Sequence, residues 1–142
     1  MKTARQLLAE KPPGAVSIAP TASVYDALKL MAERDIGALV VLEGETLVGI
    51  LSERDYARKV ILLGKSSREL QVSEIMTERV VCVGPETTVE QGMSLMTQKR
   101  CRHLPVLEDK RVIGVLSIGD LVKETISEQQ LMIAQLESYI MS

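Results

Sequence analysis

The apolar and polar positions of this chain follow two periods in turn, and the same succession occurs twice. Short β-type apolar runs at 16–18 and 80–83 each end shortly before a proline, where a strand would lose a backbone donor. Apolar residues then recur at helical spacing along 24–31 and again along 89–96. The pattern predicts a strand followed by an amphipathic helix in each half of the chain.

The next stretch of each half has the pattern of a β-hairpin. In the first half, apolar runs at 39–42 and 47–51 flank a polar turn, and a second helix is predicted after Ser52. The second half repeats this arrangement at 104–107 and 112–116. Each half is therefore predicted to fold as β-α-β-β-α, which places the chain in the α+β class.

The two halves are copies related by an offset of 65 residues without a gap for about 40 residues, from Pro20 and Pro85 onward. We divide the chain into a first repeat at 1–63 with a lead-in helix, a linker at 64–71, a second repeat at 72–126 and a C-terminal helix at 127–142. Neither half is long enough to bury its sheet well alone. We therefore expect the two repeats to pack as one body with a pseudo-two-fold axis.

The C-terminal stretch 128–141 is predicted to be a third helix, with a broad apolar side that needs to be buried. Two interpretations stay open at this point. The helix could pack back on the sheet of its own chain, or it could form a contact with another subunit or a partner protein.

Composition narrows the classes of partner. Apolar residues make up 46% of the chain and the formal charge is only -2, which is typical of a globular domain without a global field for nucleic acid or membrane. Phe and Trp are absent, so platforms for base stacking are missing. The N-terminus lacks a secretory signal and no apolar run has the length of a membrane span, so we expect a cytoplasmic protein.

Metal and disulfide chemistry are not predicted. Cys82 and Cys101 have no CxxC spacing, and His103 is the single histidine, which leaves a structural zinc site without ligands. We expect both cysteines to be reduced residues of the core. No metal cofactor is expected.

The element Gly-x-x-Ser-x-x-Asp occurs in both copies, with Ser52 and Asp55 in the first and Ser117 and Asp120 in the second. One interpretation is a capping box, in which the serine and the acid satisfy free N–H groups at a helix start. The other uses those N–H groups for a phosphate and the carboxylate for ribose hydroxyls. Arg54 favours the second interpretation, because a cap needs no guanidinium beside the carboxylate.

Catalysis is not predicted. The run from Gly114 to Gly119 has two residues before Ser117 where a nucleophile elbow has one, and no glycine-rich phosphate loop occurs. His103 has Ala38 as its counterpart and no paired acid or metal set around it. A nucleotide hydrolase or transferase would need a base or metal that the sequence does not show.

The duplicated pattern, with Arg102-His-Leu-Pro-Val before the second hairpin and Gly-x-x-Ser-x-x-Asp after each hairpin, resembles the cystathionine-β-synthase (CBS) domain pair, or Bateman module. Residues 72–77 resemble the family's lead-in helix, and 4–8 resemble it less closely, with about three additional residues at Lys11-Pro-Pro-Gly. The first copy departs from the family pattern by having Ala38-Leu-Val in place of the His/Tyr-x-Pro element.

The resemblance implies intertwined sheets with two quasi-equivalent clefts for adenosyl compounds, each joining the first strand and hairpin of one repeat to the Ser-x-x-Asp turn of the other. It implies AMP, ADP, ATP or NAD as ligand, with S-adenosylmethionine less expected. Arg54 gives the second cleft the positive charge, while Gly119 leaves the first more neutral. The implied lining is Val16, Gly37, Ala38, Ser117, Gly119 and Asp120 for cleft one, and Thr77, Val81, Arg102, His103, Ser52, Arg54 and Asp55 for cleft two.

The sequence thus predicts a stand-alone regulatory module, not an enzyme, that binds an adenine nucleotide, forms a homodimer and modulates an unidentified partner protein. The alternative is a ligand-free dimerisation scaffold, in which both Ser-x-x-Asp turns are only caps and the C-terminal helix mediates assembly.

Overall fold

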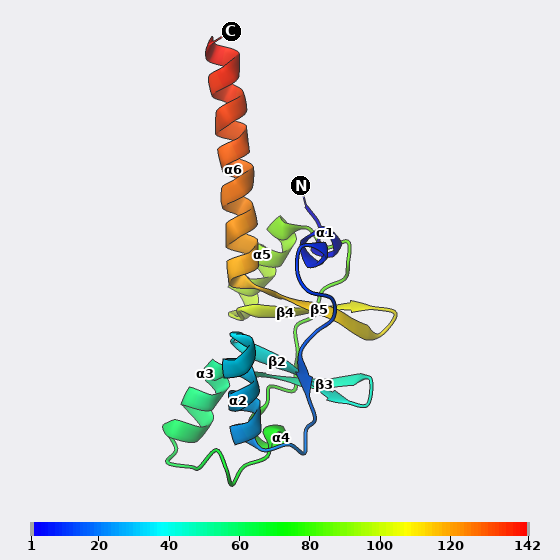
Figure 1. Ribbon diagram of the computed structural model, residues 1–142, viewed down its shortest axis with the longest axis vertical. Helices are drawn as coiled ribbons and strands as arrows, with labels where there is room; N and C mark the ends of the chain where they lie inside the picture. The colour runs from blue at the N-terminus through cyan, green and yellow to red at the C-terminus, as the bar shows by residue number, and fades with distance from the viewer. Residues whose placement is uncertain (1, 142) are drawn as a thin grey trace.

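The computed structural model describes residues 2–141 and shows two units of helices and a small sheet, one below the other, from which a long helix projects (Figure 1). The predicted α+β fold is confirmed. In chain order the elements are α1 (Ala4–Ala9), β1 (Ser17–Ile18), α2 (Val24–Arg34), β2 (Ala38–Glu43), β3 (Thr46–Ser52), α3 (Glu53–Tyr56) with a π-helical continuation (Ala57–Ile61), α4 (Val72–Ile75), α5 (Val89–Lys99), β4 (His103–Glu108), β5 (Arg111–Ser117) and α6 (Ile118–Met141).

The corresponding helices of the two repeats start and stop by the same local chemistry. Ser23 and Thr88 cap α2 and α5, each accepting a hydrogen bond from the backbone N–H three residues on. Both helices end at a residue in the left-handed region, Asp35 and Arg100, each with φ 53°. The duplication therefore preserves the helix boundaries as well as the apolar stripe.

The two sheets differ in their first strand. In the first repeat, β1 runs parallel to β2, which pairs antiparallel with β3. The second sheet contains only β4 and β5, so the predicted strand at 80–83 is wrong; only Val83 pairs there, as an isolated parallel bridge to Val106. The next ladder bond toward the N-terminus would need an N–H on Pro105, and proline has none.

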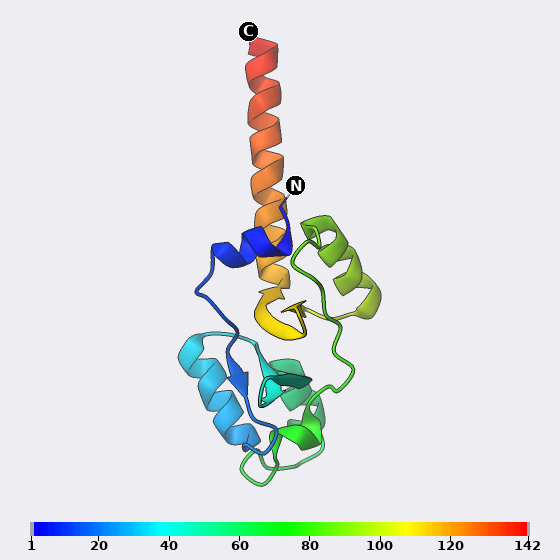
Figure 2. The same cartoon turned by 90° about the vertical axis from the view of Figure 1, so that its right-hand side faces the viewer.

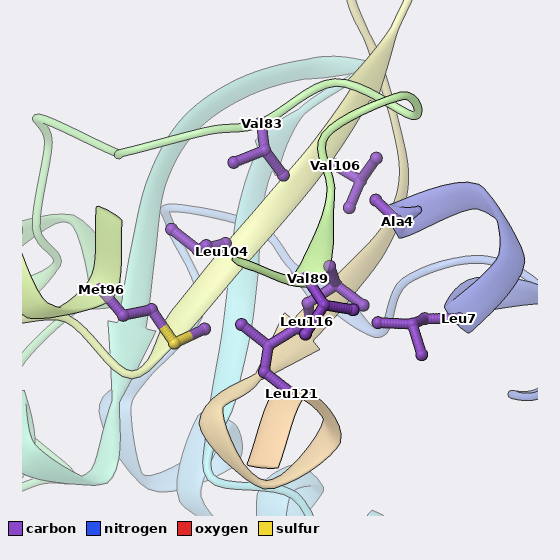
Figure 3. Close-up of a cluster of buried hydrophobic side chains, with 9 residues drawn as sticks. All are labelled: Ala4, Leu7, Val83, Val89, Met96, Leu104, Val106, Leu116 and Leu121. Carbon is purple, nitrogen blue, oxygen red and sulfur yellow. The ribbon is translucent and has the colours of Figure 1, made fainter. Parts of the chain in front are cut away.

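The lead-in helices are exchanged between the repeats. α1 buries Ala4 and Leu7 in the core of the second repeat, where Figure 3 shows them pointing from α1 toward Val89 and Leu116. α4 packs in the same way into the core of the first repeat. Each half therefore completes the core of the other, and the expected intertwined packing is observed.

Two glycines of the hairpins permit this exchange. A Cβ added at Gly114 would lie 2.5 Å from the Leu8 side chain, and one added at Gly49 would lie 2.6 Å from Met76. Backbone bonds hold the second of these contacts, because Ile50 and Thr77 exchange N–H···O bonds of 3.0 and 2.9 Å. A side chain at Gly114 would displace the Leu8 side chain, and one at Gly49 would also meet the Thr77 backbone carbonyl at 3.0 Å.

The C-terminal helix is not separate from the second repeat. α6 runs without a break from Ile118 to Met141, and its outer part extends away from both sheets in two perpendicular views (Figures 1 and 2). Its apolar side chains there are exposed, for example Ile133 by 55% and Ile140 by 76%. The interpretation that the tail packs back on its own sheet is therefore wrong. Within the described residues, no helix combines the length and the apolar character needed to span a membrane.

Candidate functional site

A large cleft lies between the repeats and corresponds to predicted cleft one. It encloses about 810 Å³, within the range of about 300–1,000 Å³ in which small-molecule sites fall. Gly119, at the exposed turn, is not part of the lining. The other five predicted residues all line the cleft: Val16, Gly37, Ala38, Ser117 and Asp120.

The Ser117–Asp120 turn forms the predicted cap at the start of α6. The Ser117 N–H donates to Asp120 Oδ2 at 2.8 Å, and the Asp120 N–H donates to Ser117 Oγ at 3.2 Å. These bonds satisfy backbone donors of the helix start and fix the carboxylate at the cleft wall. The cap is thus observed, and ribose recognition stays a prediction.

Lys11 was not identified from the sequence as a residue of the site. Its Nζ donates to Asp120 Oδ2 at 2.9 Å and to the Val115 carbonyl at 3.0 Å, from the segment at 11–14 that the second repeat lacks. Burial raises the pKa of Asp120, but the bonds from Lys11 and the Ser117 N–H outweigh it, so the pKa lies below its ordinary value. The extra length at Lys11-Pro-Pro-Gly was the available signal.

The charges that line cleft one balance. Lys11 and Arg34 are present with Asp35 and Asp120. Cations and carboxylates therefore occur in equal number in this cleft, whereas Gly119, from which a neutral first cleft was expected, does not line it.

His103 was predicted in cleft two, but its side chain lines cleft one. β4 starts where the two repeats meet, and Gly37 has no side chain to fill the space. A Cβ added at Gly37 would lie 3.6 Å from His103 Nε2. Burial and then Lys11 lower the pKa of His103, while Asp120 and Glu53 oppose them, so the imidazole is neutral near pH 7.

The structure assembles one part of predicted cleft two around Asp55. The Ser52 N–H donates to Asp55 Oδ2 at 3.0 Å, Thr77 Oγ1 donates to Oδ1 at 3.1 Å, and Lys59 Nζ lies 3.1 Å from Oδ1. Three of the predicted residues therefore meet here, and both carboxylate oxygens have partners from the chain itself.

The remaining residues predicted for cleft two lie elsewhere. Arg54 and Arg102 line a smaller cavity of about 230 Å³, together with Arg100, which sequence reasoning missed. Val81 is half-buried against the core of the second repeat. Of residues 2–141, no group of His, Cys, Asp or Glu side chains is arranged to hold a metal ion.

Comparison with known proteins identifies the architecture. The CBS domain profile matches residues 6–61 and 72–127. A CBS-domain protein structure from Burkholderia ambifaria MC40-6 is 48% identical, with a TM-score of 0.86, and the alignment covers 90% of this chain and 96% of that one. The hexameric CBS-CP12 protein of bloom-forming cyanobacteria is 33% identical, with a TM-score of 0.76, over 86% of this chain and 70% of that one.

Among curated proteins, the mitochondrial CBS domain-containing protein CBSX3 of Arabidopsis thaliana is 46% identical over 123 residues, which is 83% of this chain. The chain spans 60% of the length of that relative and 22% of the Arabidopsis protein CBSCBSPB1. Because that relative is mitochondrial, the cytoplasmic location expected from the sequence stays a prediction. The two profile matches, the exchanged lead-in helices and the likeness to solved structures establish that the chain belongs to the CBS domain family, as a pair of CBS repeats.

Proposed function

We propose that this CBS pair is a regulatory module that binds an adenine nucleotide in cleft one, catalyses no reaction and alters how the protein contacts a partner. The observation that supports the proposal best is the cleft itself. Its volume of about 810 Å³ suits a ligand of nucleotide size, and its walls combine Gly37 and Ala38 of one repeat with Ser117 and Asp120 of the other. A ligand in this cleft would contact both repeats at once.

Each wall offers a complementary group to an adenosyl ligand. Val16 and Ile36 provide apolar surface for the base, and the neutral imidazole of His103 provides one donor and one acceptor. The Asp120 carboxylate would accept hydrogen bonds from ribose hydroxyls, in part by exchange with the Lys11 ammonium. The freed ammonium would then be available to a phosphate.

Thermal denaturation with AMP, ADP, ATP, NAD, S-adenosylmethionine and adenosine tests the proposal. A ligand at a hundred times its Kd stabilises the folded state by about 2.7 kcal/mol, which for a chain of this size corresponds to a rise in Tm of roughly 5–10 °C. The compound with the largest rise identifies the ligand. An unchanged Tm with all six compounds at millimolar concentration would contradict nucleotide binding.

The alternative, a ligand-free dimerisation scaffold, is favoured by one observation, the exposed apolar side of α6. Leu131, Met132, Ile133 and Leu136 are each exposed by more than half. Such a surface is typical of a contact with another protein. The hexameric CBS-CP12 relative supports self-association of this chain as well.

We expect a homodimer in solution that depends on α6. The double substitution Ile133→Glu and Leu136→Glu should reduce the mass measured by light scattering to that of one chain, because two carboxylates would be desolvated at the contact. The matched control Gln129→Glu and Gln130→Glu adds the same charge at polar positions about one turn earlier in the helix. A dimer mass for the Ile133/Leu136 variant would show that the contact lies elsewhere. A monomer mass for the wild type would contradict the homodimer.

A further inference from the structure

A stripe of exposed side chains along α6 follows a seven-residue repeat. Its positions are separated by four and three residues in turn, which is the spacing of a coiled-coil seam, and five of the six are apolar. At 3.6 residues per turn the stripe is about 80° wide, narrower than the face by which a helix packs on a globular core. The positions of this seam are Val122, Ile126, Gln129, Ile133, Leu136 and Ile140.

The seam is not covered by the chain to which it belongs. At the base of α6, Leu121 is buried in the core of the second repeat and Glu124 forms an ion pair with Lys2. Val122 and Ile126 are exposed on another side of the same turns. Beyond this base the helix extends away from both repeats (Figures 1 and 2). The seam is therefore accessible over about 27 Å of helix, at a rise of 1.5 Å per residue.

Two charges beside the seam distinguish the possible directions of a second α6 helix. Lys123 and Glu137 each directly follow a seam position, and no ion pair or hydrogen bond within residues 2–141 involves either side chain. In a parallel pair of helices, Lys123 would face Ile118 of the partner subunit and Glu137 would face Met132 of the partner subunit, so neither charge would gain a counter-ion. Reversing one helix brings Lys123 of each copy beside Glu137 of the partner subunit.

We propose that two copies of this chain associate through an antiparallel two-stranded coil of their α6 helices. In this direction Val122 faces Ile140 of the partner subunit and Ile126 faces Leu136 of the partner subunit, and the two-fold axis repeats each pair. Gln129 lies near the axis, so the apolar layers are at both ends of the coil. The proposal rests on the homodimer expected under the proposed function, and it adds the direction and register of the contact.

The antiparallel coil places the two CBS pairs at its opposite ends. Only the outer part of one helix then approaches the base of the other, whereas a parallel coil would bring the two second repeats side by side. No residue of the seam lines cleft one. The coil therefore leaves the proposed nucleotide site of each copy open.

Charge reversal tests the direction of the coil. In Lys123→Glu, we expect the dissociation constant of the dimer, measured by sedimentation equilibrium at low ionic strength, to rise roughly tenfold, because two attractive pairs become repulsive. Glu137→Lys should have the same effect. The double variant Lys123→Glu/Glu137→Lys exchanges the signs and restores both pairs, so its dissociation constant should return to the wild-type value. A double variant as weak as either single variant would overturn the antiparallel arrangement.

Ser127→Glu and Ser138→Lys are the matched controls. Both serines are exposed on the side of α6 opposite the seam, so the variants introduce the same signs of charge into the same helix without reaching the partner. Their dissociation constants should equal that of the wild type. A rise in these controls as large as in Lys123→Glu would overturn the specific pairing, as would unchanged dissociation constants in Lys123→Glu and Glu137→Lys.

Cross-linking provides a second measure of direction. Lys123→Cys, Glu137→Cys and the double variant are prepared with Cys82 and Cys101 replaced by serine, and each protein is treated with a short bismaleimide. In the antiparallel coil the two residues 123 lie about 24 Å apart along the axis, so only the double variant should form a covalent dimer. Covalent dimers of the single variants would show a parallel coil and overturn the proposal. Absence of a covalent dimer in all three variants would also overturn it.

The coil and the proposed nucleotide binding fail separately. A covalent dimer of the double variant alone, with no rise in Tm for any adenosyl compound, would support the coil and contradict nucleotide binding. A rise in Tm together with covalent dimers of the single variants would support nucleotide binding and contradict the antiparallel direction.

Discussion

Replacing Leu7 by alanine is expected to lower the free energy of unfolding by about 2–5 kcal/mol, although Leu7 lies in a helix of only six residues near the N-terminus. Leu7 is only 5% exposed and belongs to the core that contains Leu104, Leu116 and Leu121. Truncation removes apolar contacts and leaves a cavity that this packed core can close only in part. The loss of stability should therefore appear in the second repeat, although that repeat is distant from Leu7 in the sequence.

Urea denaturation measures the loss, and amide hydrogen exchange locates it. Protection should fall first in α5, β4 and β5, because α1 packs against these elements, while β2 and β3 keep theirs. Ile61→Ala is the control, since Ile61 is 57% exposed and its truncation should change stability by less than about 0.5 kcal/mol. Loss of protection in β2 and β3 instead would show that α1 supports its own repeat.

Asp120→Ala is expected to abolish adenosyl binding in cleft one, and Asp55→Ala to abolish it at the Asp55 turn, the part of predicted cleft two that the structure assembles, with the fold retained. The reason is that a carboxylate is the one group at each turn able to accept two hydrogen bonds from ribose hydroxyls. If the acids serve only as caps, each substitution should cost about 1 kcal/mol of stability and leave the binding stoichiometry unchanged. In Asp120→Ala, Lys11 also loses its partner, so residual affinity for phosphate can persist without ribose recognition.

Calorimetric titration with the ligand identified by thermal denaturation, together with urea denaturation, separates the two roles. Asp26→Ala is a matched control, because Asp26 is also an acid in the first turn of a capped helix but lines neither cleft. It should share the small loss of stability and keep full binding. Unchanged stoichiometry in Asp55→Ala and Asp120→Ala would assign both carboxylates to capping alone.

The repeated unit and the local chemistry of this protein follow from the amino-acid sequence alone. Periodicity predicted the helices and hairpins because a strand and a helix place their apolar residues at different spacings. Because the two halves are related by an offset of 65 residues, each element is predicted in both repeats. The Ser-x-x-Asp turns form the caps that their spacing indicates. Such features depend on residues a few positions apart, so a single sequence contains them.

One prediction failed, and one question that the sequence left open was answered by the structure. The strand at 80–83 is lost because Pro105, on the neighbouring strand, has no N–H to donate, and that pairing is set by the sheet. The stretch 128–141 continues α6, and no glycine or proline follows Ile126 to end the helix. An apolar stripe indicates that a face is to be buried, but it does not indicate by what.

Which residues of the two repeats meet depends on how the whole elements pack. The tertiary structure placed α1 in the core of the other repeat, brought Lys11 to Asp120 over 109 positions, turned His103 toward Gly37 and joined Arg100 to Arg54 in one cavity. Residues that are distant in the chain meet through the packing of whole elements. The pattern along the chain fixes the face that each element presents, and only the assembled fold fixes the neighbour on that face.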